Sequence, residues 1–275
     1  MKTRLLLFFM AIVLVGCVGK PSRQSVNAGD AEVIVEEVLN DQPASSVMEN
    51  VEKCRVATKT ENSKLVFIEP HYNTIELVFN DDGFNDFMSL EINGDSTVLA
   101  VAAAYTKKYH WSEFNHMLIA GSHAGGGKSY EGYRCPENTG AFIYANKHWS
   151  FINMDIDERI SELYGISDAC AFAQTMLVHE GKVQQIPKTL PVKRHIRRAL
   201  CDMHNELVVV ESKNKLTLEE FSNELLESGV HSAIYLDMGA MSYSVWREYS
   251  NDSIMIIHPV NNITKFATNY LRFQL

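Results

Sequence analysis

Short apolar runs separated by polar turn residues make up most of the chain from residue 64 onward. The runs KLVFIEP, TIELVF and FMSLEI are rich in β-branched and aromatic residues and are divided by Asn, Asp and Gly, which predicts three strands. TVLAVAAAYTKKY and HMLIAG continue the strand pattern. In GAFIYANKHWSFI, two apolar and aromatic runs flank residues 145–147, which predicts a β-hairpin. A weaker helical pattern covers residues 31–57, ahead of these strands.

The second half of the chain continues with strand pairs that are joined by tight turns. FAQTMLVHEGKVQQI predicts a hairpin that turns at Glu180 and Gly181. RRALCDMHNELVVVES predicts another, which turns around His204 and Asn205. Between the first-half strands and these pairs, DIDERISELYG predicts a short helix that ends before Gly165.

The best-marked helix of the chain lies in LTLEEFSNELLESG. Thr217 and Glu220 have the spacing of a capping box, the leucines and a phenylalanine form one apolar stripe, and Gly229 stands where a left-handed C-cap belongs. The helix leads directly into an apolar run, Ser232–Leu236, which predicts a buried strand. We therefore expect an α+β fold with mixed or antiparallel sheets and a few packed helices. Asp237 then lies at the end of a strand, where functional groups gather.

The first 30 residues indicate export. Residues 1–16 combine a basic start with an apolar stretch that is too short for a membrane span, as in a secretory signal peptide. The tetrapeptide LVGC resembles the bacterial lipobox, in which the cysteine, here Cys17, is acylated and becomes the new N-terminus. Residues 17–30 are polar and unpatterned, as in a flexible tether, and residues 31–275 are long enough for a single main domain. We expect a lipoprotein anchored to the membrane in the periplasm or at the cell surface.

Charge and one glycine-rich stretch narrow the choice of partners. The formal net charge is −9, which argues against a nucleic-acid partner, since such binding depends on a positive patch. The stretch GSHAGGGKS resembles a P-loop, but five residues separate Gly121 from Gly127, one more than the motif allows. The following YEGYRCPENTG does not have a helical pattern, so no helix N-terminus faces a phosphate. We expect no nucleotide partner, and a glycine-rich loop that serves another pocket.

Cysteines and histidines give no metal or cofactor signal. Beyond Cys17, four cysteines remain, Cys54, Cys135, Cys170 and Cys201, and they permit three disulfide connectivities or free thiols. No pairing is predicted. The histidines lack the i, i+4 and HExxH spacings of metal ligands, so we expect no metal site and no cofactor.

Four segments in order carry a family resemblance. MLVHEGKV, IRRALCDMHNELVVV, LTLEEFSNELLESGVHSAIYLDMGAMS and TKFATNYLRF resemble the C-terminal half of the phosphodiester glycosidase domain family. The resemblance covers residues 95–275 and is strongest over 176–275. The family includes the uncovering enzyme, an N-acetylglucosamine-1-phosphodiester glycosidase, and many exported bacterial proteins. It implies a glycosidase that hydrolyses a glycosyl 1-phosphodiester, with N-acetylglucosamine as one candidate for the sugar.

The motifs of the family transfer to this chain position by position. Arg197 falls on the arginine of its R-T-A-x-G strand, and Cys201 replaces that glycine. YLDMGAMS falls on the N-L-D-G-G-G-S-S pattern, where Asp237, Gly239 and Ser242 match and four other positions, Met238 among them, do not. Upstream, AVAAAYT resembles a strand ending in N-G-G-F-F, with Ala102 in place of the asparagine and Tyr105 in place of a phenylalanine.

The resemblance assigns chemical roles to several of these residues. Asp237 is expected to act as nucleophile, general base or acceptor of a sugar hydroxyl, because glycosidases stabilise an oxocarbenium-like transition state with carboxylates. Arg197 is expected to bind the phosphate through its planar fork. Ser242 and Arg198 are further substrate-binding candidates, although alternation along a strand places Arg197 and Arg198 on opposite faces.

The glycine-rich stretch supplies the remaining candidates. His123, Gly125, Gly126, Gly127 and Lys128 are expected to form a flexible wall beside the sugar-phosphate site, since consecutive free amides attract anions. The alternative is a lipid-anchored protein that binds a glycan or phosphoglycan without cleaving it. Replacement of the family's asparagine by Ala102 and of a motif glycine by Met238 favours that alternative.

Overall fold

The computed structural model describes residues 54–57, 64–80, 96–107, 113–190, 192–239, 244–247, 254–258 and 266–275. The residues from Glu49 to Leu275 group into one compact unit. The predicted signal peptide with Cys17, the tether, the strand FMSLEI and Ser242 lie outside the described residues.

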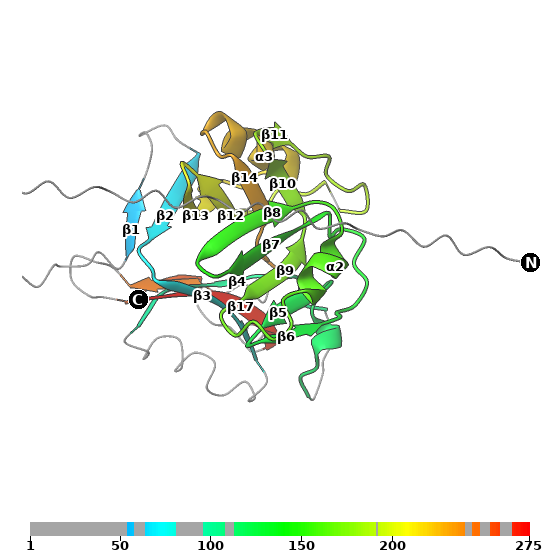
Figure 1. The fold of residues 1–275 in the computed structure, drawn as a ribbon. Coiled ribbons are helices and arrows are strands. Elements are labelled where there is room, and N and C mark those ends of the chain that lie inside the picture. Colours follow the sequence, from blue (N-terminus) through cyan, green and yellow to red (C-terminus); the bar gives the residue numbers. More distant parts are fainter. Residues whose placement is uncertain are drawn as a thin grey trace, which may run out of the picture. The chain divides into compact units, whose positions relative to one another are not determined.

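Three antiparallel sheets make up the fold (Figure 1). Every pairing between the named strands is antiparallel. The largest sheet has seven strands, in the order β1 (Cys54–Ala57), β2 (Leu65–Pro70), β13 (Glu206–Ser212), β12 (Arg198–Met203), β14 (Ser232–Tyr235), β10 (Met176–His179) and β11 (Lys182–Val183).

Two five-stranded sheets complete the fold. The C-terminal sheet has the order β16 (Ile254–His258), β15 (Ser244–Arg247), β4 (Thr97–Ala102), β17 (Asn269–Gln274) and β3 (Thr74–Phe79). The hairpin sheet has the order β6 (Lys128–Tyr130), β5 (His123–Gly125), β9 (Cys170–Gln174), β7 (Gly140–Ala145) and β8 (His148–Ile152). The helices within the described residues are α2 (Ile156–Ser161), α3 (Leu218–Glu227) and the one-turn 3₁₀ helix η1 (His116–Leu118). The fold is thus mostly antiparallel sheet with few helices, and it is richer in strands than the expected α+β arrangement.

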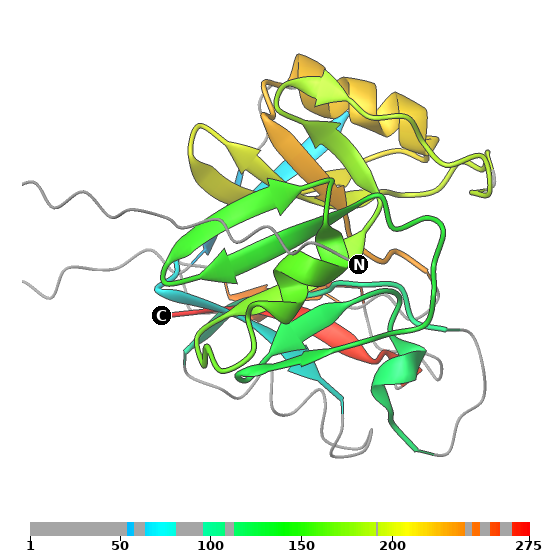
Figure 2. The same cartoon turned by 45° about the vertical axis from the view of Figure 1, so that its right-hand side comes forward.

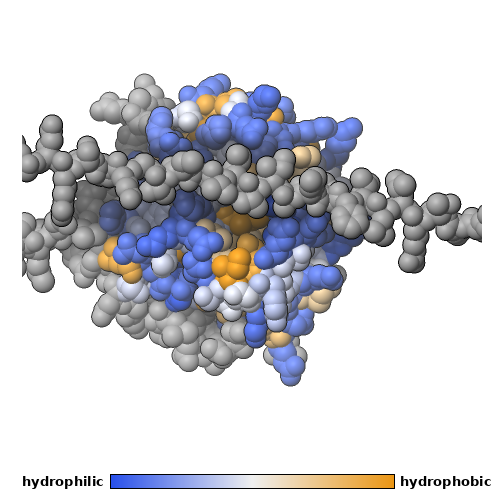
Figure 3. Space-filling model, viewed as in Figure 1, coloured by the Kyte–Doolittle hydropathy of each residue, from blue (hydrophilic) through white to orange (hydrophobic). Residues whose placement is uncertain are grey.

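Both faces of the seven-stranded sheet are buried, and alternation along β12 shows how. Leu200 joins a large hydrophobic cluster with side chains of the two other sheets, such as Leu99 and Phe172. Ala199 and Cys201 point to the opposite face and join a second cluster under α3. Figure 2 shows α3 lying across that face of the sheet, next to β10 and β11. The surface seen in Figure 3 is largely hydrophilic, so most apolar side chains of the described residues lie inside.

The predicted hairpins are confirmed, together with their turns. Asn146 and Lys147 join β7 to β8 with φ of 52° and 63°, and His204 and Asn205 join β12 to β13 with φ of 57° and 62°. Two consecutive positive φ angles are typical of the turns that match the right-handed twist of a two-residue hairpin. Glu180 and Gly181 connect β10 and β11 in the same way.

The predicted helix boundaries are also confirmed. The Thr217 hydroxyl accepts a hydrogen bond from the Glu220 amide at 3.1 Å, and the Glu220 carboxylate accepts one from the Thr217 amide at 2.9 Å. This reciprocal capping box satisfies two amides that α3 itself leaves unpaired. Gly229 follows the helix with a φ of 87°, as a left-handed C-cap requires. The short helix α2 ends ahead of Gly165, whose φ is also positive.

Two local predictions are wrong. Residues 54–57 form strand β1, paired with β2, and not the end of a helix. The weak helical pattern does not determine the structure of these residues, because their backbone forms hydrogen bonds with strand β2. The run HMLIAG begins with η1, and only Ile119 and Ala120 make isolated bridges, to Thr106 and Tyr133. None of the described helices is long and apolar enough to cross a membrane.

Candidate active site around Asp237

The stretch GSHAGGGKS forms a β-hairpin in place of the expected loop. β5 and β6 pair across a turn at Gly126 and Gly127, whose φ angles are 59° and 75°. The amides of Gly125 and Lys128 belong to this paired region, and a Cβ at Gly125 would lie 2.7 Å from the Leu77 carbonyl oxygen. The Lys128 side chain is exposed. The glycines therefore serve a tight turn and close packing against β3.

His123 is completely buried within this hairpin. Its Nδ1 donates to the Gly121 carbonyl at 2.9 Å, and its Nε2 lies 2.9 Å from Nδ1 of His116. Its ring packs beside those of Phe79 and Tyr130, at centroid distances of 5.5 and 5.6 Å. Burial lowers the pKa of His123 to about 4, and the neighbouring His116 contributes to the decrease. The imidazole has no access to solvent and takes a place in the core beside the hairpin.

Asp237 lies directly after β14, where the seven-stranded sheet meets the C-terminal sheet. Its amide donates to the carbonyl of Ala103, just beyond β4, at 2.9 Å. Its Oδ1 accepts a hydrogen bond from the Gly239 amide at 2.9 Å, which fixes the orientation of the carboxylate. Only 7% of the residue is exposed. The short strand thus delivers an oriented, nearly buried carboxylate to the junction of two sheets.

Three tyrosines lie within electrostatic reach of this carboxylate: Tyr105, Tyr133 and Tyr235. Burial is the main cause that raises the pKa of each, and the negative charge of Asp237 raises all three further. The rings of Tyr105 and Tyr235 lie 5.8 Å apart. All three phenols therefore keep their protons at neutral pH and are hydrogen-bond donors.

Arg197 occupies the same face of the sheet as Tyr235. Its Nε donates to the Leu216 carbonyl at 2.9 Å, Nη2 donates to the Lys193 carbonyl, and Nη1 reaches the Tyr235 hydroxyl at 3.4 Å. The guanidinium also lies over the Tyr235 ring, 5.9 Å from its centroid. Within the described residues no carboxylate forms an ion pair with it. Arg197 is thus a cation that is held in place by backbone carbonyls.

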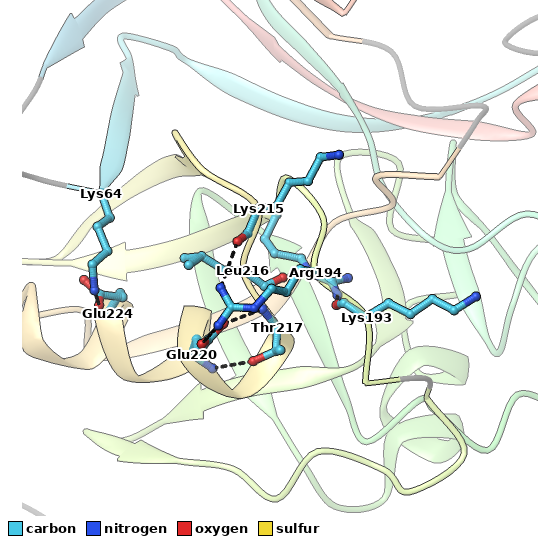
Figure 4. A network of polar contacts seen from close by, with 9 residues as sticks. Lys64, Lys193, Arg194, Lys215, Leu216, Thr217, Glu220 and Glu224 are labelled. Atoms are coloured by element: carbon cyan, nitrogen blue, oxygen red, sulfur yellow. Dashed lines mark hydrogen bonds and ion pairs between the residues drawn. The ribbon is translucent and has the colours of Figure 1, made fainter.

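Figure 4 shows the polar contacts around the start of α3, with Lys193 and Leu216, whose carbonyls accept from Arg197. Arg194 pairs with Glu220 at the start of α3 and donates to the Lys215 carbonyl at 3.4 Å. Lys64 pairs with Glu224, while Lys193 and Lys215 point away from the network (Figure 4). The capping box of α3 and the segment that carries Arg197 are therefore fixed to each other.

Arg198 points to the opposite face, as strand alternation predicted. It is fully buried, donates to the Glu211 carboxylate from Nε at 3.1 Å and from Nη2 at 2.7 Å, and donates to the Ser244 hydroxyl at 2.7 Å. Burial lowers its pKa, although Glu211 opposes that change. The described contacts place Arg198 between β13 and β15, away from solvent.

Glu137 and Cys135 are neighbours of the site that the sequence did not indicate. The Cys135 thiol donates to the Glu137 carboxylate at 3.1 Å, and the Thr175 hydroxyl donates to the Glu137 carbonyl at 2.9 Å. Burial, aided by the Glu137 carboxylate, raises the pKa of Cys135 to about 11, so the thiol stays protonated. Glu137 and Asp237 both raise the pKa of Tyr133. The segment CPEN contains no motif from which a role for Glu137 could be predicted.

A cavity of about 870 Å³ is lined in part by Tyr133 and Cys135. Its wall comes from residues 121–122, 129–136 and 138, from α2 and from Ala173. Asp237 and Arg197 do not line it, and of the glycine-rich stretch only Gly121, Ser122 and Ser129 do. The structure therefore does not bring Asp237, Arg197 and the whole of that stretch into one cavity. Within the described ranges, His, Cys, Asp and Glu form no cluster able to hold a metal ion.

Comparison with known proteins identifies the family. The sequence profile of the phosphodiester glycosidases matches residues 95–268, which is more than half of the chain. The chain belongs to the phosphodiester glycosidase family. Among curated proteins, none matches the chain.

Solved structures have the same fold as this member of the family. The catalytic domain of zebrafish N-acetylglucosamine-1-phosphodiester alpha-N-acetylglucosaminidase, auto-inhibited by its pro-peptide, superposes with a TM-score of 0.52 at 13% identity. That match covers 82% of this chain and 88% of the zebrafish domain. A hypothetical protein from Synechocystis superposes with a TM-score of 0.51 at 9% identity, over 81% of this chain and 61% of its own. Both similarities are similarities of fold.

The segment that matches the phosphodiester glycosidases contains the site but not the whole fold. Asp237, Arg197, the tyrosines and the cavity all lie within residues 95–268. Strands β1, β2, β3 and β17 lie outside it, although β17 is central to the C-terminal sheet, between β4 and β3.

Proposed function

We propose that this phosphodiester glycosidase hydrolyses a glycosyl 1-phosphodiester and that the bond is cleaved at Asp237. The observation that carries the proposal is the placement of Asp237. The resemblance assigns it the aspartate of the family motif, its Oδ1 is oriented by the Gly239 amide, and its charge acts on three protonated tyrosines. A carboxylate held in this way needs little reorganisation to stabilise developing positive charge.

Cleavage at an anomeric carbon proceeds through an oxocarbenium-like transition state and commonly uses two carboxylates. We assign Glu137 as the second carboxylate, since its charge and that of Asp237 both act on Tyr133. In the proposed reaction Asp237 stabilises the sugar cation or attacks it, and Glu137 activates the water that completes hydrolysis. A phosphate leaves readily without strong acid assistance, so the reaction does not require a carboxylic acid of raised pKa.

The tyrosines and Arg197 have binding roles in this proposal. Tyr105 and Tyr133 donate their hydroxyl protons to the sugar or to the departing phosphate. Arg197 supplies positive charge for the phosphate, since two of its five N–H donors remain after the three contacts described above. Because backbone carbonyls fix the guanidinium, the ordering of this side chain costs nothing when substrate binds.

An N-acetylglucosamine 1-phosphodiester is the first substrate to test, since the zebrafish protein of similar fold is named for that bond. Release of the free sugar is measured for the wild-type protein and for Asp237→Asn, which keeps the shape of the side chain. We expect at least a roughly hundredfold loss of kcat, as for other lost catalytic acid–base groups. Glu137→Gln is expected to lower kcat as well.

Asp168→Asn is a matched control, because Asp168 is exposed and lies outside the site. Its activity is expected to equal that of the wild type. Full activity of Asp237→Asn would contradict the role of Asp237, and loss of activity in Asp168→Asn would show that the assay reports on folding.

A second candidate function is binding of a glycan or phosphoglycan without cleavage. One observation favours it: Ala102, at the position of the family's asparagine, is 4% exposed at the end of β4 and offers no polar side chain. Saturable binding of several glycosyl phosphodiesters, with no product after long incubation, would establish this alternative.

The cell envelope is the proposed location, through acylation of Cys17. The basis is the lipobox-like LVGC after an apolar stretch. Mass spectrometry of the protein from membranes is expected to find a diacylglyceryl group on Cys17 as the first residue. Cys17→Ala is expected to abolish the modification, and an intact N-terminus in the wild-type protein would contradict the proposal.

A further inference from the structure

The segment that follows β4 makes the backbone contact with Asp237, and it is buried. The carbonyl of Ala103 accepts the hydrogen bond from the Asp237 amide at 2.9 Å. Ala103 and Ala104 are both shielded from solvent. Buried backbone amides and carbonyls need hydrogen-bond partners within the protein, because water does not reach them. Since β4 ends at Ala102, the strand pairing of β4 does not supply partners for Ala104.

The side chain of Asn269 supplies both partners of Ala104. Its Oδ1 accepts a hydrogen bond from the Ala104 amide at 2.8 Å, and its Nδ2 donates to the Ala104 carbonyl at 3.2 Å. The pairing of β17 with β4 ends where Tyr270 faces Ala102, and Asn269 is the next residue of β17 (Figure 1). The carboxamide, which carries a donor and an acceptor side by side, therefore continues the pairing one step beyond the end of β4.

Two threonine hydroxyls extend this contact to the next turn of the segment. Nδ2 of Asn269 also donates to the Thr268 hydroxyl at 3.0 Å, and that hydroxyl is hydrogen-bonded to the Thr106 hydroxyl at 2.8 Å. The Thr268 amide donates to the Thr106 hydroxyl at 3.3 Å. All three side chains are buried. The start of β17 thus holds the segment at Ala104 and again at Thr106.

The residue between these two anchors is Tyr105. Its carbonyl accepts a hydrogen bond from the Ala120 amide at 2.9 Å, so the segment is also held from its other side. Its phenol lies within electrostatic reach of Asp237. One short segment therefore carries both the carbonyl that receives the Asp237 amide and a tyrosine of the candidate site.

We infer that Asn269 is a positioning residue, which fixes the segment 103–105 and, through it, the places of Asp237 and Tyr105. Its effect on catalysis rests on the proposed function. A reacting group that is displaced by about 1 Å, even by a remote substitution, can cost roughly a hundredfold in rate. Loss of the Asn269 contacts therefore lowers kcat more than it weakens substrate binding, which depends on further groups such as Arg197. Asn269 lies one residue beyond the segment that matches the family.

The first test measures kcat and KM in the full chain with an N-acetylglucosamine 1-phosphodiester. Asn269→Ala leaves the amide and the carbonyl of Ala104 without partners. We expect kcat to fall at least roughly tenfold, with KM changed much less. Thr268→Val and Thr268→Ser are a milder pair, because serine keeps the hydroxyl and valine does not. We expect a lower kcat for the valine variant and nearly wild-type kcat for the serine variant.

Ile75→Val is the matched control for a loss of stability. Ile75 lies on β3, the other neighbour of β17, and faces Phe273, near the opposite end of β17 from Asn269. The variant is expected to lower the Tm by a few degrees through looser packing of the same sheet. Its kcat, measured well below the Tm, is expected to equal that of the wild type. A fall of kcat in Ile75→Val that matches the fall in Asn269→Ala would overturn the inference.

Hydrogen exchange of the Asp237 amide, followed by NMR, measures the positioning without any turnover. That amide donates to the Ala103 carbonyl, so loosening of the segment exposes it to exchange. In Asn269→Ala we expect it to exchange at least roughly tenfold faster relative to the amides of the central strand β12, which report on global unfolding. In Ile75→Val we expect the relative rate to stay at its wild-type value. An unchanged relative rate in Asn269→Ala would overturn the inference.

The two measurements separate this inference from the proposed function. Absence of hydrolysis by the wild type would overturn the proposed function, and exchange at the Asp237 amide would still decide the role of Asn269. Hydrolysis by the wild type, with unchanged kcat in Asn269→Ala, would overturn the inference alone. Where Asn269→Ala does not fold, the Thr268 pair decides, and equal kcat and equal exchange in its two members would contradict the inference.

Discussion

Loss of stability in mild acid is expected from His123. The carbonyl of Gly121 only accepts hydrogen bonds, so Nδ1 of His123 carries the proton in the neutral ring and Nε2 accepts from His116. Protonation of Nε2 would place a charge in a completely buried position, against a hydrogen that His116 already donates. The rings of Phe79 and Tyr130 lie beside that of His123 and carry no negative charge.

The size of this loss of stability follows from the difference between the pKa of His123 in the folded protein and its pKa in the unfolded chain. The pKa is about 4 in the folded protein, against the ordinary 6.5 of an exposed histidine. The folded pKa is the lower one, so the unfolded chain takes up the proton first as the pH falls. Stability is complete above about pH 6.5 and is lost as the pH falls towards 4. Linkage gives a loss of about 2 kcal/mol at pH 5 and about 3 kcal/mol at pH 4 from this group alone.

Urea unfolding followed by tryptophan fluorescence at pH 7 and pH 5 measures this loss. Carboxylates also titrate in this range, so the relevant quantity is the difference between the wild type and His123→Gln. The variant is expected to be less stable at pH 7 and to lose about 2 kcal/mol less on going to pH 5. His148→Gln, at an exposed position on β8, is the matched control and is expected to follow the wild type. Parallel pH profiles for the wild type and His123→Gln would refute the reasoning.

Two further predictions concern the framework that holds the site. Glu211→Gln leaves the fully buried Arg198 without its counter-charge and is expected to lower the free energy of unfolding by about 3–5 kcal/mol. The double variant Arg198→Met/Glu211→Leu is expected to recover most of that loss in urea titrations, and no recovery would contradict the electrostatic cause. Thr217→Ala removes the N-cap of α3 and is expected to cost about 1 kcal/mol, whereas Thr217→Ser keeps it. Equal unfolding midpoints for the two Thr217 variants would contradict this role.

The elements that the sequence predicted correctly are those with strong local signals. The hairpin turns at Asn146–Lys147 and His204–Asn205 and the capping box of α3 depend on residues close together in the chain. Strand β1 was missed because its backbone is satisfied by pairing with β2, which a helical pattern does not reveal. The hairpin of β5 and β6 was taken for a loop because three glycines lower the strand propensity, while pairing with β9 holds it in place.

Of the residues at the candidate site, Asp237 could be predicted from the sequence, whereas Tyr133 and Glu137 could not. Asp237 follows a strand, β14, that the apolar pattern of the sequence predicts, so its place at the end of that strand was predicted. Tyr133 and Glu137 reach the site through sheet pairings and turns that connect distant segments, and no spacing in the sequence encodes these. His123 was a plausible binding residue in the sequence, but the structure gives it a place in the core, because its ring completes an aromatic cluster.

The strands outside the matched segment have a consequence for how this family is delimited. β17 contributes Leu271 and Phe273 to the main core, and β2 and β3 contribute Ile68 and Ile75. A gene cut at residues 95 and 268 would encode the site residues and yet remove strands from two of the three described sheets, among them the inner strand β17. The smallest unit able to evolve, be exchanged between genes or be expressed alone is therefore wider than the segment by which the family is recognised.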